Sequence, residues 1–110
     1  MALFGLYGEH AVESCPLTNQ DSRRVVLEGR AILNDTITLK DKYKINQIVN
    51  QYHSALEHTF LWVVDAQDPH LLQQAAIDSG LARFNSVRIV PLSHYSDVVK
   101  KCEAIESKRL

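Results

Sequence analysis

The sequence is short of the residues that would place it outside the ordinary globular class. It holds only 2 Cys, 3 Pro and 4 Gly in 110 residues, which excludes a disulfide-rich secreted scaffold and a collagen-like or low-complexity chain. It also lacks an excess of either charge, since 12 Lys and Arg oppose 13 Asp and Glu for a net charge of -1. Without a basic surplus there is no strong counterion-release term, and we expect no nucleic-acid partner.

Long hydrophobic runs are missing as well. The opening MALFGLYGEH has a short apolar stretch without a positive flank and continues into Glu9 and His10, unlike a signal peptide or a membrane span. We therefore expect a cytoplasmic protein with no membrane partner. Cys15 and Cys102 lie far apart and form no CxxC pair, so both are predicted to be free thiols. The absence of a P-loop, GxSxG or HExxH motif argues against nucleotide binding and the familiar hydrolases.

What is present is an alternation of strand and helix signals in a chain of single-domain length, residues 1–110. Short apolar or alternating runs predict four strands, at Ala2–Gly8, Lys44–His53, His58–Val64 and Ser86–Leu92. Apolar residues at helical spacing predict three helices: one after a cap at Thr18 or Asn19 and ending near Asn34, one from Asp68-Pro69 to Gly80, and one over Ser96–Ile105. The chain from Thr36 to Tyr43 could add a further helical turn.

The order β-α-β-β-α-β-α predicts an α+β fold, the ferredoxin-like split βαβ sandwich with sheet order 4-1-3-2. In such a fold the helices cover one face of the sheet. Phe60, Trp62 and Val64 alternate with Leu61 and Val63, so both faces of the third strand are apolar. We expect the second face to be buried by a second copy, giving a homodimer. The alternative is a monomer with scattered exposed apolar side chains.

The segment Tyr7-Gly8-Glu9-His10, followed by Glu13-Ser14-Cys15-Pro16, resembles the N-terminal segment of a family of small proteins of unassigned function. That family is related to the dimeric α/β-barrel superfamily and is similar to this chain over nearly its full length. It carries histidines at positions matching His53 and His58. The resemblance implies a compact ferredoxin-like protomer that pairs sheet to sheet, and it implies no established reaction.

Three histidines are predicted to converge at one edge of the sheet. His10 ends the first strand, His53 ends the second and His58 begins the third, and these ends meet in the split βαβ topology. A hairpin closed by His53 and His58 would place their Cβ atoms about 4.5 to 5.5 Å apart. With Cys15 and Glu13 in the loop after His10, the donor set suits Zn, Fe, Cu or Ni. We interpret the five residues as candidate metal ligands.

Other interpretations of the same residues stay open. The histidines could be neighbours without a ligand, and Cys15 could be a structural thiol or a nucleophile activated by His10 or His53. A metal-free pocket is the second hypothesis, lined by Tyr7, Phe60, Trp62 and Phe84 and taking a small organic molecule. His10 and His53 would then act as acid and base in an isomerase- or monooxygenase-like enzyme. The same four aromatic side chains could equally be core. We expect His70 and His94 to be surface residues.

Overall fold

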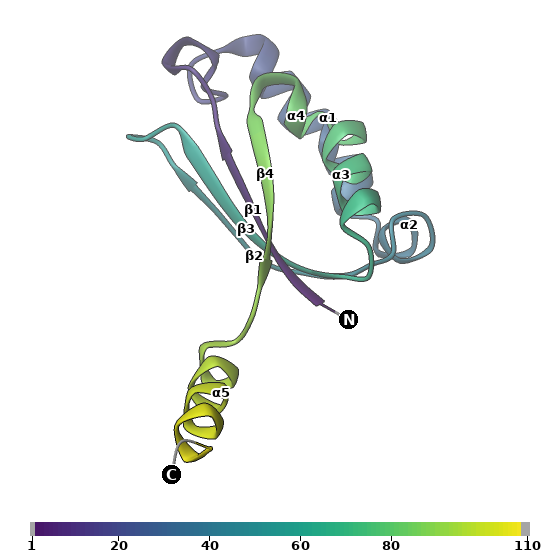
Figure 1. Cartoon of the computed structure of the whole chain (residues 1–110). Coiled ribbons are helices and arrows are strands. Elements are labelled where there is room, and N and C mark those ends of the chain that lie inside the picture. Colours follow the sequence, from purple (N-terminus) through teal and green to yellow (C-terminus); the bar gives the residue numbers. More distant parts are fainter. Residues whose placement is uncertain (1, 109–110) are drawn as a thin grey trace.

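The computed structural model describes residues 2–108 and contains one four-stranded antiparallel sheet (Figure 1). The strands are β1 (Ala2–Glu9), β2 (Ile45–Ser54), β3 (Thr59–Ala66) and β4 (Ser86–Leu92). They lie in the order β2-β3-β1-β4, which is 4-1-3-2 when read from the β4 edge. The architecture is α+β and is compatible with a ferredoxin-like fold.

The α-helices that precede β4 lie on one side of the sheet, and the last α-helix lies apart from it (Figure 1). Those on the sheet are α1 (Gln20–Leu33), α2 (Thr36–Asp41), α3 (Pro69–Asp78) and α4 (Leu81–Phe84), while α5 (Tyr95–Ser107) follows β4. Asn19 caps α1 by accepting a hydrogen bond from the Ser22 N–H, and Asp68 caps α3 with Pro69 at its first position. None of the helices within residues 2–108 has the length and apolarity that crossing a bilayer requires.

The core forms between the helices and one face of the sheet. Its side chains include Phe4 and Leu6 of β1, Phe60 and Val64 of β3, and Leu72 of α3. Beside them lies Tyr43, which is 1% exposed and donates a hydrogen bond of 2.6 Å from its hydroxyl to Asp78 Oδ2. This bond joins the chain before β2 to the end of α3, and it satisfies the one polar group of a buried aromatic side chain.

Strand β2 departs from the simple alternation that its sequence suggests. Its pairing with β3 shifts between Ile45 and Gln47 and again between Ile48 and Asn50, as β-bulges do. Ile45 and Ile48 therefore both lie on the core face, although plain alternation places them on opposite faces. After the second shift, Tyr52 pairs with Leu61 on the other face.

The face of the sheet away from α1–α4 carries no helix (Figure 1). We call it the open face. The register places there apolar residues from the two central strands and β4, namely Leu3, Gly5, Tyr7, Leu61, Val63, Val90 and Leu92, together with the charged Asp65 and Arg88. The predicted two-sided apolar character of β3 is thus present, with one side in the core and the other on the open face.

Helix α5 projects from the end of β4, away from the rest of the molecule (Figure 1). The predicted helix is confirmed and one residue longer at its start, and two at its end. Its expected apolar stripe is exposed, with Val98 41%, Val99 39% and Ile105 60% accessible, and Cys102 is exposed as well. The long extent of 61 Å and the radius of gyration of 16.7 Å reflect this arm, since a compact chain of this size has a radius near 13 Å.

Candidate metal centre

Strand register brings the chain ends that carry the histidines to one end of the sheet. Glu9 of β1 pairs with Thr59 of β3, and Ser54 of β2 pairs with the same Thr59 from the other side. His10 and His58 are the residues just beyond these pairs. Their backbones are joined directly, because the His10 N–H donates to the His58 carbonyl at 3.0 Å.

The β2–β3 hairpin closes one residue later than a His53–His58 pairing requires. Ser54 and Thr59 form the last pair, His53 lies opposite Phe60, and His58 is the final residue of the turn. His58 has φ 58°, a left-handed conformation that few non-glycine residues adopt, and its N–H donates to the Ser54 carbonyl at 2.9 Å. The expected direct opposition of His53 and His58 is therefore wrong. The turn instead directs the His58 ring toward His10.

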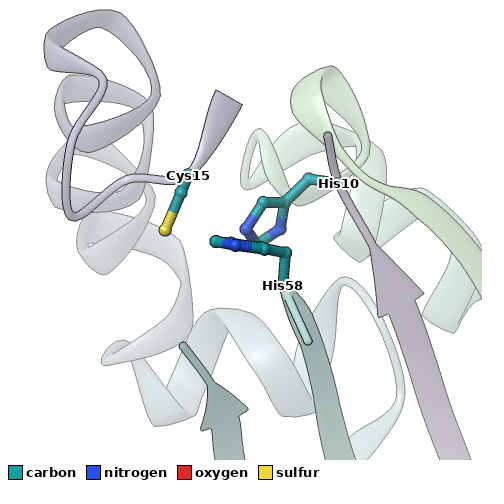
Figure 2. Close-up of side chains that lie close together, drawn as sticks. All are labelled: His10, Cys15 and His58. Carbon is teal, nitrogen blue, oxygen red and sulfur yellow. The ribbon is translucent and has the colours of Figure 1, made fainter. Parts of the chain in front are cut away.

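His10, Cys15 and His58 form a cluster of potential ligand atoms. One nitrogen from each ring and the Cys15 sulfur all lie within 4.8 Å of one another, and Figure 2 shows the three side chains pointing together from separate segments. Cys15 is 2% exposed. Within the described chain, His10 Nε2 and His58 Nδ1 are buried and have no hydrogen-bond partner. Unpaired buried nitrogens are costly, so two of them beside a thiol need a physical reason.

Asn85 fixes the orientation of the His10 ring. His10 Nδ1 lies 2.8 Å from Asn85 Oδ1, and the amide of Asn85 is oriented by its own donation from Nδ2 to the Leu81 carbonyl at 2.9 Å. Because that oxygen can only accept, Nδ1 carries the hydrogen. In the neutral ring the lone pair is therefore on Nε2, the nitrogen that faces the cluster. Metal-binding histidines are commonly held by such a hydrogen bond on their other nitrogen.

The loop that carries Cys15 is held by side chains at the start of α1. Arg23 donates from Nε to the Pro16 carbonyl at 3.1 Å and from Nη2 to the Leu17 carbonyl at 3.2 Å. Asn19 donates from Nδ2 to the Glu13 carbonyl at 2.9 Å. The thiol position is therefore set by several bonds to backbone carbonyls on both sides of Cys15.

His53 stands beside the cluster, outside the group of three. Its ring stacks on His10 with 5.7 Å between centroids and 7° between planes, and the His58 ring contacts His10 at 5.5 Å from another side. The three predicted imidazoles thus do converge. Burial lowers the pKa of His53 below its ordinary value of 6.5, and the neighbouring charges of His10 and His58 lower it further. These surroundings favour the neutral form of the His53 ring.

Two of the predicted site residues lie elsewhere. Glu13 is exposed, and its carboxylate does not belong to the group of close ligand atoms. Tyr7 pairs with Leu61 on the open face, on the far side of the sheet from the helices. The reason is parity: Tyr7 is one residue from Leu6 and so points the other way.

The remaining aromatic candidates line a cleft next to the cluster. Phe60, Trp62 and Phe84 border a space of about 420 Å³ between α1 and the sheet, and His10 and His53 also line it. The other lining residues are mainly apolar, including Leu17, Val25, Val26, Leu33 and Leu81. A volume in this range is typical of small-molecule sites.

Asn85 and Arg23 were not anticipated as site residues. Asn85 is 75 positions from His10 in sequence, and nothing near it marks it as more than the residue before a strand. Its position after a helix and directly before a strand that neighbours β1 is the only available signal.

Comparison of the sequence with protein-family models found no match, and comparison with curated proteins found no significant match.

Proposed function

We propose that this protein binds a transition-metal ion between His10, Cys15 and His58. The observation that carries the proposal is the pair of buried, unpartnered imidazole nitrogens next to a buried thiol. A cation coordinated by those nitrogens would supply the partner that each lacks. The hydrogen bond from His10 Nδ1 to Asn85 supports the same assignment, since it directs the free lone pair into the cluster.

The donor set favours zinc, with copper, nickel and iron as the other candidates. Two imidazoles and one thiolate match the nitrogen and sulfur preference of Zn²⁺, whereas Mg²⁺ and Ca²⁺ select oxygen. Three protein ligands leave one position open in a tetrahedral site, the arrangement of catalytic rather than structural zinc. His53, stacked on His10 beside the cluster, is the candidate base that would accept a proton from a metal-bound water or substrate.

The adjoining cleft gives this site a place for a small organic molecule. Its mainly apolar lining, with a few polar side chains such as His10, Arg23 and Asn85, is typical of a site that holds a small organic molecule and fixes its orientation through a few polar contacts. The same cleft supports an alternative function without a metal. In that case His10 and His53 act as acid and base in an isomerase- or monooxygenase-like enzyme.

We further propose that the protein is a homodimer whose open sheet face is buried by a second copy, as its resemblance to the dimeric α/β-barrel superfamily implies. The apolar row on that face supports this assembly. We also propose a reducing, cytoplasmic environment. Its support is that Cys15 and Cys102 are free, and a metal-ligating thiolate would be lost to oxidation.

Metal titration of the wild-type protein and three variants tests the site. Cobalt(II) is a useful probe, because a Cys15 thiolate ligand produces sulfur-to-cobalt charge-transfer absorption that Cys15→Ser removes. His58→Ala is expected to weaken zinc binding by at least tenfold, because it removes one of three ligands. His70→Ala, at an exposed histidine outside the cluster, is the matched control and keeps wild-type affinity.

Two results would contradict the proposal. One is equal zinc affinity in His58→Ala and His70→Ala. The other is cobalt binding without a charge-transfer band. If neither metal binds and an apolar carboxylate still quenches the fluorescence of Trp62, the single tryptophan, the metal-free alternative replaces it.

A further inference from the structure

Helix α5 carries an apolar stripe that nothing in the described chain covers. Val98, Cys102 and Ile105 recur at intervals of four and three, with Tyr95 and Val99 on the same side. No residue of α5 is buried, and Tyr95 is 81% exposed. The helix residues that approach the sheet are polar: Asp97, Lys100 and Lys101 line a shallow cleft with Leu3 and Leu92. The apolar stripe therefore faces away from the helix's own sheet.

A helix of this length is not stable by itself. α5 has 13 residues, and isolated helices shorter than about 12 to 15 residues are marginal in water even with good helix formers. Its sequence contains two Val and one Ile, which are weaker helix formers than Ala or Leu. Burial of the stripe against another surface would supply the missing stability.

The same chain offers a surface of the matching kind in its open face. We infer that α5 of one copy packs its apolar stripe against the open sheet face of a second copy, and that the second copy reciprocates. Because each copy contributes one arm and one sheet face, the two contacts of a dimer use both surfaces of both copies, and the assembly ends at two copies. This inference specifies the dimer proposed above and does not depend on whether a metal is bound.

The areas favour exchange of the arm over contact between two bare sheets. Four strands spaced about 4.8 Å apart, with about eight residues each rising 3.3 Å, project roughly 500 Å². A stable interface buries about 800 Å² per partner. An arm of 13 residues is about 20 Å long and 10 Å wide, which adds roughly 200 Å². The bare face alone falls short of that size, and the exchanged arm would bury further apolar surface on each copy that contact between two bare sheets leaves exposed.

The open face includes the charged Asp65 and Arg88; Arg88 lies over the Tyr7 ring, whereas Asp65 is incompletely paired. Asp65 lies on the open face in the row of Leu3 and Leu92, and its Oδ1 is buried with no hydrogen-bond partner among residues 2–108. Lys101 is three residues after Val98 and lies at the edge of the apolar stripe, at the boundary with the side that approaches the helix's own sheet. An ammonium group at the margin of the docked helix can pair with this carboxylate, which the chain's own contacts leave half satisfied.

Cross-linking through Cys102 tests the inference in the full-length protein. Cys102 is exposed and Cys15 is buried, so a mild oxidant reaches only the α5 thiol. Second cysteines are introduced one at a time across the open face, by Asn50→Cys, Val63→Cys or Val90→Cys. Gln73→Cys, exposed on α3, is the control on the helix-covered side. At least one open-face variant should yield a covalent dimer that Cys102→Ser abolishes, and Gln73→Cys should not.

Sedimentation of the double variant Val98→Asp/Ile105→Asp provides the second test. Because both side chains are exposed, the fold and zinc affinity should match wild type while the dimer dissociates at least a hundredfold more readily. A wild-type monomer at tens of micromolar overturns the inference. A cross-link that forms only between two Cys102 residues also overturns it, since α5 would then pack against α5 of the second copy and not against its sheet. A wild-type protein that is dimeric and does not bind zinc would refute the metal proposal alone.

Discussion

Replacing Asn85 tests whether the orientation of one ring controls the proposed metal centre. Asn85→Ala removes the acceptor that holds His10 Nδ1 and also the bond to the Leu81 carbonyl. His10 is then free to rotate or to exchange its tautomer, so Nε2 no longer points reliably into the cluster. The variant still contains all three candidate ligand residues, so only the orientation of the His10 ring changes.

The expected loss can be stated for binding and for folding separately. Removing an orienting partner of a metal-bound histidine costs about 10- to 100-fold in affinity, or roughly 1.4 to 2.7 kcal/mol. Asn85 is 8% exposed, so the variant also leaves His10 Nδ1 and a carbonyl without their partner. That should lower the free energy of unfolding by about 1 to 3 kcal/mol.

Asn85→Asp separates the two effects. An aspartate oxygen still accepts from His10 Nδ1, so zinc affinity should stay within about threefold of wild type, whereas the second oxygen meets the Leu81 carbonyl and lowers stability. Competition with a chromophoric chelator gives the affinities, and urea unfolding gives the stabilities. Asn46→Ala, at an exposed amide far from the cluster, is the control. If Asn85→Ala loses stability and keeps wild-type zinc affinity, the orienting role is refuted.

Three further outcomes are expected. Burial lowers the pKa of His53, so at a pH below 6.5 the unfolded chain binds a proton there more readily than the folded protein does. The free energy of unfolding should therefore be independent of this group above pH 6.5 and fall as the pH drops below it. The midpoint of urea unfolding, measured from pH 5 to 8, should depend less steeply on pH in His53→Gln. Gly8→Ala drives a Cβ into the Phe60 ring and should cost about 1 to 3 kcal/mol in thermal unfolding, with a shift of Trp62 fluorescence at the cleft; unchanged fluorescence would contradict it. Tyr43→Phe loses its bond to Asp78 and should cost about 1 kcal/mol in urea unfolding, against no loss for Tyr95→Phe on the exposed arm.

Local patterns predicted most of the fold. The strand from Ser86 to Leu92, the Asp68-Pro69 helix start and the cap at Asn19 follow from short-range chemistry and are confirmed. The sequence predicts the end of α1 near Asn34 and leaves open a further helical turn from Thr36 to Tyr43; the segment forms the separate helix α2, which Asp35 caps by accepting from the Thr38 N–H. A second capping residue only two positions after a helix end is a weak signal in sequence.

Strand topology determines which residues meet at the site, and that part could be predicted from the sequence. The register of the β2–β3 hairpin determines which side chains face Cys15, and that part could not. The meeting of His10, His53 and His58 follows from which strand ends share an edge. Which two of the three face Cys15 depends on the closing pair of the hairpin and on the left-handed conformation of His58. A shift of one residue exchanges the faces of a strand, and no local pattern in Ser54–Thr59 determines it.

The order of the site residues along the chain has a consequence for biosynthesis. His10, Cys15 and His58 have all been translated while Asn85, which holds the His10 tautomer, is still to be made. β4, which pairs with β1 and follows Asn85, comes later still. If the protein binds a metal as proposed, the His10 nitrogen that faces the cluster is selected by a residue that is made after all three candidate ligands.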